Sequence, residues 1–148
     1  MAKDILGRHV RIWVDNSSAV AKDLSDDLVP NTLSGIGLTP EEVDMTGQSA
    51  SIKQARAGVS DSSVTAQFYM NDTVTTGAFT VLEGVQGLAG TLTVQFGTDG
   101  APATGDPEWE GEYVLFDLSV SVSGGAAIMN VLFKPAPGST PAWGTATI

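Results

Sequence analysis

The stretch from residue 113 to residue 134 has the sequence YVLFDLSVSVSGGAAIMNVLFK and decides the expected fold. Over residues 113–123 the side chains alternate, which is typical of a strand because successive side chains point to opposite faces of a sheet. Gly124 and Gly125 follow, and glycine tolerates the positive φ of a two-residue hairpin turn. Residues 126–134 supply the return strand. The stretch therefore predicts a β-hairpin whose first strand has one apolar face, made of Val114, Phe116, Leu118, Val120 and Val122.

The same kind of alternation predicts further strands outward from this hairpin. They are expected at Arg8–Asp15, Thr32–Leu38, Glu42–Thr46, Ser62–Met70 and Gly90–Phe96. Together with the hairpin they predict a β-rich chain, and 148 residues suffice for a single domain over 1–148.

One helix is expected. Phe79, Leu82 and Val85 recur at three-residue spacing and predict a helix over Thr75–Gly87, with Thr75 or Thr76 as its N-cap. Three other segments are rich in glycine, proline or serine and predict irregular structure: a long loop at about 47–58, a loop at 97–107, and a C-terminal tail at about 135–148.

Composition excludes several classes of function. The chain has no cysteine and one histidine, which excludes thiolate metal sites and cysteine nucleophiles and argues against a Ser-His-Asp triad. Its 17 acidic and 7 basic residues give a net charge of −10, the wrong sign for holding nucleic acid by its phosphates. No apolar run approaches the ~20 residues of a membrane helix. We therefore expect no enzyme, no catalytic residue, no cofactor or metal, and no membrane partner.

Four acidic residues stand at alternate positions just before the hairpin: Asp106, Glu108, Glu110 and Glu112. In an extended chain they share one face at ~6.5 Å spacing. Three interpretations are open: a calcium site, a pair of catalytic carboxylates, or a solvated acidic surface. The first lacks the spacing of a calcium-binding loop, and the second needs a cleft. A solvated acidic surface is the simplest interpretation.

Charged side chains normally protect a sheet edge from pairing with other chains. The predicted hairpin has only two, Asp117 and Lys134. Unpaired backbone groups at such an edge are satisfied if copies of the chain place their sheets side by side around a closed ring. The pattern therefore predicts self-assembly.

The order of these features resembles the major tail tube proteins of long-tailed bacteriophages and related tail-like particles. The resemblance rests on a segment at 36–47, IGLTPEEVDMTG, followed by a long loop and the strand SSVTAQFYMND at 62–72. A helix, the strand TLTVQF, a glycine-rich loop, the hairpin at 113–134 and a tail containing tryptophan complete the pattern. The resemblance covers nearly the whole chain through short motifs.

The resemblance implies an antiparallel β-sandwich or half-barrel with one flanking helix. It also implies hexameric rings that stack into a tube, through which DNA passes without specific binding. The loop at Gly47–Gly58 would reach the neighbouring ring, where Lys53 and Arg56 would meet acidic residues. The row from Asp106 to Glu112 would lie on the outer surface or in the lumen.

Partners implied by the resemblance are the tape-measure, tail-terminator and distal tail proteins, in a virion tail whose subunits are made in the host cytoplasm. The alternatives are a capsid decoration or cement protein, and a calcium- or carbohydrate-binding β-sandwich module.

Overall fold

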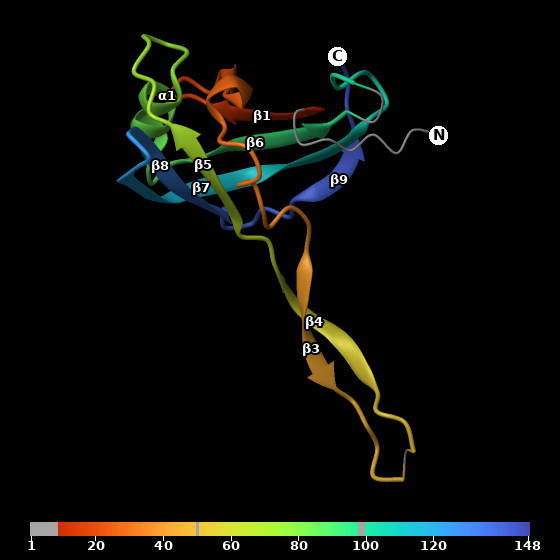
Figure 1. The fold of residues 1–148 in the computed structure, drawn as a ribbon. Helices are drawn as coiled ribbons and strands as arrows, with labels where there is room; N and C mark the ends of the chain where they lie inside the picture. Colours follow the sequence, from red (N-terminus) through yellow and green to blue (C-terminus); the bar gives the residue numbers. More distant parts are fainter. Residues whose placement is uncertain (1–8, 50, 98–99) are drawn as a thin grey trace.

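The computed structural model describes residues 9–49, 51–97 and 100–148, which form a curved antiparallel sheet and a projecting hairpin (Figure 1). The sheet has seven strands in the order β2-β1-β6-β7-β8-β5, with β9 also paired to β7. The strands are β1 Val10–Asp15, β2 Ala21–Asp23, β3 Thr39–Asp44, β4 Ala55–Asp61, β5 Val64–Tyr69, β6 Ala89–Phe96, β7 Pro107–Ser123, β8 Ala126–Pro135 and β9 Ala142–Thr145. The helix α1 spans Ala78–Val85, and a short 3-10 turn spans Ser25–Asp27. The predicted mainly-β antiparallel fold with one flanking helix is confirmed.

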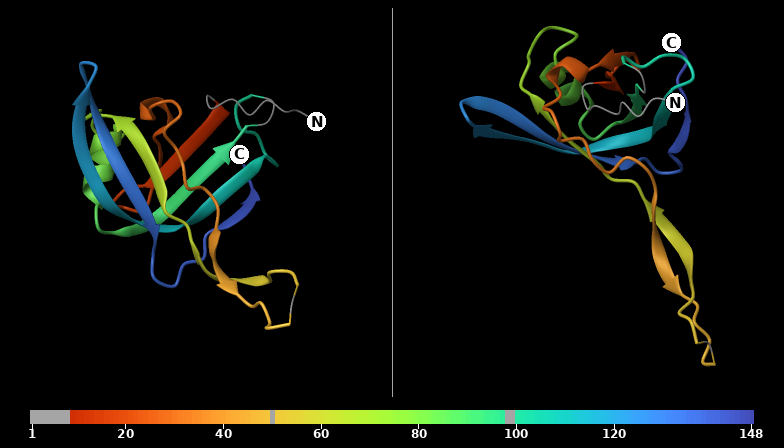
Figure 2. Two further views of the ribbon diagram at one scale, coloured as in Figure 1. Left: turned by 60° about the horizontal axis from the view of Figure 1, so that its bottom comes forward. Right: turned by 45° about the vertical axis from the view of Figure 1, so that its right-hand side comes forward.

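The core lies in the hollow of the sheet, which curves as a half-barrel around α1 and the segment at 24–36 (Figure 2). Alternate residues of β1, β5 and β6 point into this hollow because one face of each strand is apolar. Helix α1 buries Ala78, Val81, Leu82 and Val85 against it. The largest completely buried side chains are Trp109, Tyr113, Phe68, Ile12, Leu24, Leu82, Leu92, Leu115 and Met129.

The hairpin at 113–134 is confirmed as β7 and β8, but its predicted apolar face is wrong. The register shifts between Leu115 and Asp117, so Phe116 has no partner on β8. This β-bulge inserts one residue, and the alternation of faces changes there. Leu115 is therefore buried, whereas Phe116 is 60% exposed and Val122 is 78% exposed.

The segment predicted as a strand at Thr32–Leu38 is not one. Only Ser34 forms an isolated bridge, to Thr65 of β5. Gly35 and Gly37 have φ of 84° and 116°, which are incompatible with a strand. Gly35 also packs so close to the carbonyl of Ser63 that no side chain would fit. The segment instead runs beside the outer edge of β5 and bonds to it at Ser34.

The remaining differences concern the limits of elements. Strand β4 begins at Ala55, so the last four residues of the loop predicted at 47–58 are strand. Strand β9 lies within the tail predicted to be irregular at 135–148. Of the strand predicted at Arg8–Asp15, Arg8 lies outside the described residues, and β1 begins at Val10.

Helix α1 is shorter than predicted and neither threonine caps it. Thr75 has a φ of 68°, and Gly77 occupies the N-cap position without a side-chain bond. The first helical N–H, that of Ala78, instead donates to Oδ2 of Asp27 at 3.1 Å. A carboxylate from a distant segment therefore satisfies and stabilises the helix N-terminus.

Strands β3 and β4 form a separate two-stranded sheet that projects from the curved one (Figures 1 and 2). We call residues 39–61 the arm and the rest of the described chain the body. Every described arm residue is exposed except Val43, which is half-buried. The arm therefore has no core of its own.

Candidate assembly surfaces

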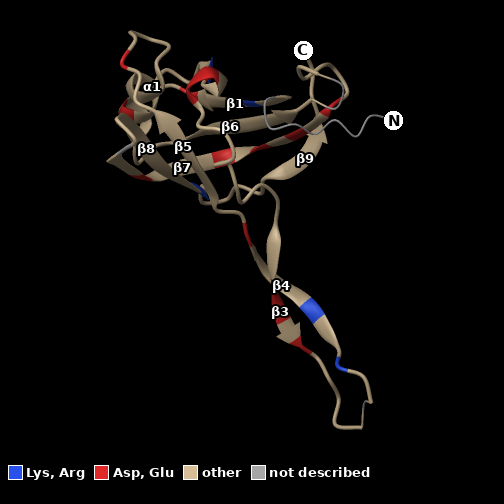
Figure 3. Cartoon of the chain, viewed as in Figure 1, with Lys and Arg blue, Asp and Glu red and all other residues tan. Residues whose placement is uncertain are grey.

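The arm carries both basic residues that the sequence singled out. Lys53 lies beyond the strands, near the turn, and Arg56 is paired with Val43 across the hairpin (Figure 3). Around the turn, the Met45 N–H donates to the Gln54 carbonyl at 2.8 Å, and the Thr46 N–H donates to Asp44 at 2.9 Å. The side-chain and backbone bonds from Thr46 lower the pKa of the Asp44 carboxyl.

Apolar side chains of the arm are strongly exposed. Met45 is 52% exposed, Ile52 is 73% exposed and Val59 is 80% exposed. An isolated two-stranded hairpin is marginally stable at best in water. The arm is therefore suited to contact another molecule.

A buried polar chain ties the base of the arm to the body. Ser62 follows β4 directly, and its Oγ lies 2.7 Å from the Tyr113 hydroxyl. The same hydroxyl accepts a bond from the Trp109 indole N–H at 2.8 Å. Ser62, Trp109 and Tyr113 are all buried, so the joint between arm and body is fixed by packing as well as by hydrogen bonds.

One edge of β7 is unpaired over its second half. Strand β6 pairs with β7 only as far as Val114, and beyond Leu115 no strand in the described part of the chain lies on that side. The outer edge of β5, in contrast, is partly covered. The Val29 N–H donates to the Gln67 carbonyl, and Ser34 exchanges backbone bonds with Thr65. Residues 116–123, which we call the distal edge, expose backbone groups that another strand can pair with.

The four residues of the acidic row lie on β7 and just before it. Glu108, Glu110 and Glu112 lie on the outer face of β7, opposite the buried Trp109. Asp106 precedes the strand and accepts the Ala103 N–H at 2.8 Å.

Neighbouring threonines of β6 bond to two of these glutamates. Thr91 donates to Glu112 at 2.6 Å and Thr93 donates to Glu110 at 3.3 Å. Burial, followed by the charge of Glu110, raises the pKa of Glu108, and a bond from Gln95 opposes this. No cluster of metal-ligating side chains occurs among the residues that the structure describes.

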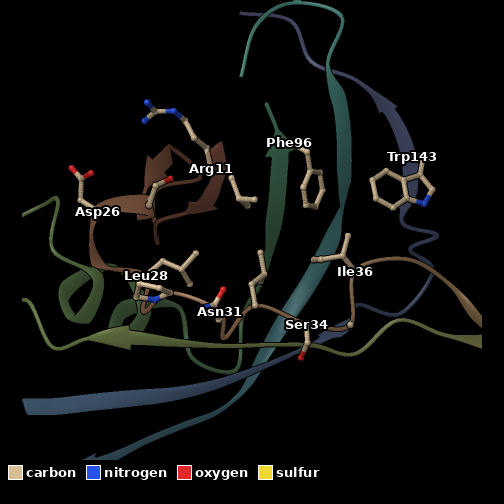
Figure 4. A pocket seen from close by; sticks show the side chains of 13 residues that line it. Arg11, Asp26, Leu28, Asn31, Ser34, Ile36, Phe96 and Trp143 are labelled. Carbon is tan, nitrogen blue, oxygen red and sulfur yellow. The ribbon is translucent and has the colours of Figure 1, made fainter. Parts of the chain in front are cut away.

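A cavity of about 740 Å³ opens between the segment at 25–36 and the ends of β1, β6 and β9 (Figure 4). Its apolar wall includes Phe96 and Trp143, whose ring centroids are 5.9 Å apart. Sequence reasoning missed this cavity because its lining residues are far apart along the chain. Across residues 9–49, 51–97 and 100–148, no helix has the length and apolar character needed to cross a membrane.

Comparison with solved structures identifies similar folds in tail-like particles. A chain in the six-fold symmetric tail of an empty GTA particle aligns with a TM-score of 0.63 and 18% identity, over 95% of this chain and 98% of that one. A chain in the sheath/tube terminator structure of the PVC extracellular contractile injection system aligns with a TM-score of 0.60 and 11% identity, over 92% and 93%.

A chain in the six-fold symmetrised baseplate of the anti-feeding prophage gives a TM-score of 0.55 at 13% identity, over 96% and 97%. This chain has the fold of tail-particle subunits. No protein-family model matches the sequence, and no curated protein matches it significantly. The fold resemblance inferred from the sequence motifs is thus confirmed by structure, at identities too low to carry a function by themselves.

Proposed function

We propose that the chain is a structural subunit of a phage tail or tail-like particle, and that it assembles into stacked hexameric rings forming the tail tube. The observation that carries the proposal is the combination of a full-length tail-particle fold with two unsatisfied surfaces, the distal edge and the arm. Two of the similar structures are six-fold assemblies, which supports a ring of six copies.

Within a ring, the distal edge of each copy pairs with a strand of its neighbour. A closed ring removes every such edge, because each copy both gives and receives a strand. Phe116, Val120 and Val122 are 60%, 49% and 78% exposed along this edge, so pairing also removes apolar surface from water. Between rings, the arm makes the contact, and Lys53 and Arg56 meet acidic groups of the adjacent copy.

The charge of the chain supports a conduit. With a net charge of −10, the assembled wall repels phosphate and lets DNA pass without being held by counterion release. The row of Glu108, Glu110 and Glu112 contributes to this negative potential whether it lies in the lumen or on the outer surface. The role is structural and not catalytic, and needs no cofactor.

The proposal places the chain in the virion tail after synthesis in the host cytoplasm. Its partners are other copies of itself, the tape-measure protein inside the tube, and the tail-terminator and distal tail proteins at its ends.

Negative-stain electron microscopy of the purified chain tests the proposal. We expect tubes or six-fold rings from the wild type, and monomers from Val122→Lys, because a lysine on the distal edge blocks strand pairing. The matched control is Val74→Lys, since Val74 is 80% exposed in the loop before α1 and should tolerate the change. A monomer or trimer that binds capsid shells would instead identify a decoration protein, and equal assembly of both variants would remove the distal edge from the ring contact.

A further inference from the structure

The cavity at the open end of the half-barrel has the composition of a binding pocket. We call it the end pocket. Phe96 of β6, Trp143 of β9 and Ile36 surround one space in Figure 4, while Arg11 and Asp26 stand on its rim. Trp143 is 56% exposed although its ring contacts Trp109 edge-on at 5.1 Å. An apolar concavity with a polar rim is the usual form of an interaction site.

The rim of the end pocket carries one uncompensated charge. Arg11 is paired with Asp23 at 3.3 Å. Asp26 is exposed and, among the described residues, has neither a hydrogen bond nor an ion pair. An occupant with an apolar side chain next to a cation would therefore match both the wall and the rim.

The tip of the arm, residues 45–49 and 51–54, has this composition. It exposes Ile52, and Lys53 is adjacent. No acidic residue occurs between Met45 and Gln54, in a chain that otherwise carries 17 of them. The tip and the end pocket are therefore complementary in apolar character and in charge.

The lengths also agree with docking between stacked copies. About ten residues separate Thr39 from the tip, and at ~3.3 Å per residue they span about 33 Å. A compact body of about 125 residues has a radius of gyration of ~14 Å and hence a diameter of about 36 Å. In a stack of equally oriented copies, the tip of one arm then reaches the level of the arm base of the next copy.

One wall of the end pocket lies near that level. Ile36, which lines it, is three residues before the arm begins at Thr39. The arm leads away from the body in Figures 1 and 2, so its tip lies far from the body of its own copy. We propose that the arm tip of one copy inserts Ile52 into the end pocket of the next copy, with Lys53 beside Asp26. The inference rests on the stacking of copies in the proposed function and names the acceptor of the arm.

The absence of cysteine from the chain allows a clean cross-linking test. The double variant Ile52→Cys/Ile36→Cys is oxidised after assembly and separated on a non-reducing denaturing gel. We expect a ladder of multimers, because each copy has both a donor and an acceptor thiol. The control Ile52→Cys/Val74→Cys places the second thiol on an exposed loop and should give no more than dimers.

Charge reversal tests the rim contact independently. Asp26→Lys and Lys53→Asp, each introduced into the Ile52→Cys/Ile36→Cys chain, should reduce the ladder several-fold, and both changes together should restore it. Thermal melting of each variant checks that the body remains folded.

The outcomes separate this inference from the proposed tube. Tubes in the microscope with no ladder, or with equal ladders for the pocket and control pairs, would overturn docking in the end pocket and leave the tube standing. A ladder without tubes would support docking and overturn the tube. The absence of both overturns both.

Discussion

The body and the arm use the same backbone hydrogen bonding but differ completely in what their side chains bury. In the body, Ile12, Phe68 and Trp109 are each 0% exposed, whereas the described arm residues are all exposed apart from Val43. Burial of apolar surface contributes most of the stability of a sheet, and a lone hairpin lacks it. The body is therefore stabilised within one chain, whereas the arm gains no comparable burial from its own chain.

Removing the arm should have the largest effect on assembly. Thr39 and Asp61 are paired, so an Asn-Gly turn can replace residues 40–60 and close a short hairpin. We expect complete loss of rings stacked into tubes, since the inter-ring contact is gone. We also expect a melting temperature within a few degrees of the wild type, because the core is untouched. Sedimentation velocity and circular dichroism measure the two effects.

Unfolding of this variant would contradict the conclusion that the body is stable without the arm. A fall in melting temperature of more than about 10 °C would correspond to well over 1 kcal/mol in a domain of this size. The arm would then contribute to the stability of its own chain, and an exposed hairpin would have to be reconsidered as part of the body.

The joint between the two regions should be sensitive to a single hydroxyl. Tyr113→Phe leaves the Ser62 hydroxyl and the Trp109 indole N–H buried without their partner. Each unsatisfied buried group costs about 1–3 kcal/mol, so we expect a loss of roughly 2–3 kcal/mol in the free energy of unfolding, measured with urea. Tyr69→Phe is the matched control, because Tyr69 is 41% exposed and should change stability by less than ~0.5 kcal/mol. Equal effects of the two variants would show that the buried chain does not stabilise the joint.

The sequence predicts the body well where one face of a strand is buried. Alternation located β1, β5, β6 and the hairpin of β7 and β8, and the Gly124-Gly125 turn fixed where that hairpin reverses. The alternation failed to predict the exposure of Phe116. The sequence of a strand does not show where its pairing with a neighbouring strand contains a bulge. Only the register with β8 shows that the apolar face changes there.

The arm and the end pocket are harder to predict for a different reason. Strand β4 has the sequence ARAGVSD, whose apolar residues are small or exposed, and every residue of the strand is exposed. The end pocket combines apolar residues from four separate segments, namely Val10, Leu28 and Ile36, Phe96, and Trp143. The sequence interpretation assigns Lys53 and Arg56 to a long loop, whereas in the structure Lys53 lies near the turn of the arm and Arg56 lies in β4.

The cap of α1 offers a smaller test within the body. Asp27 accepts bonds from the Ala78 N–H and from the side chain of Asn71, and 51 residues separate it from the helix start. Asp27→Ala should lower the free energy of unfolding by about 1–2 kcal/mol, since a helix N-terminus loses its acceptor. Asp26→Ala is the control and should leave the folded monomer unaffected. If both variants melted alike, the distant cap would not contribute.

The pKa of Asp44 on the arm is lowered and the pKa of Glu108 on the body is raised. Their opposite effects on the pH dependence of stability are the smallest effects that we expect. On the arm, the bonds from Thr46 lower the pKa of Asp44, so their stabilising effect is present above the ordinary value of 3.8 and is lost as pH falls. On the body, burial raises the pKa of Glu108 above its ordinary value of 4.5. The folded chain therefore binds that proton more tightly than the unfolded chain, and stability falls as pH rises through the window that begins near 4.5.

Glu108→Gln removes the ionisation and should flatten this part of the pH profile, so the variant gains stability relative to the wild type between pH 4 and pH 7. Glu110→Gln should flatten it less, because the charge of Glu110 is the second cause of the raised pKa and burial is the first. Urea unfolding of the three proteins across this range measures the difference. Parallel profiles for wild type and Glu108→Gln would mean that Glu108 is as well solvated in the folded body as in the unfolded chain. The outer face of β7 would then be as exposed to water as the arm.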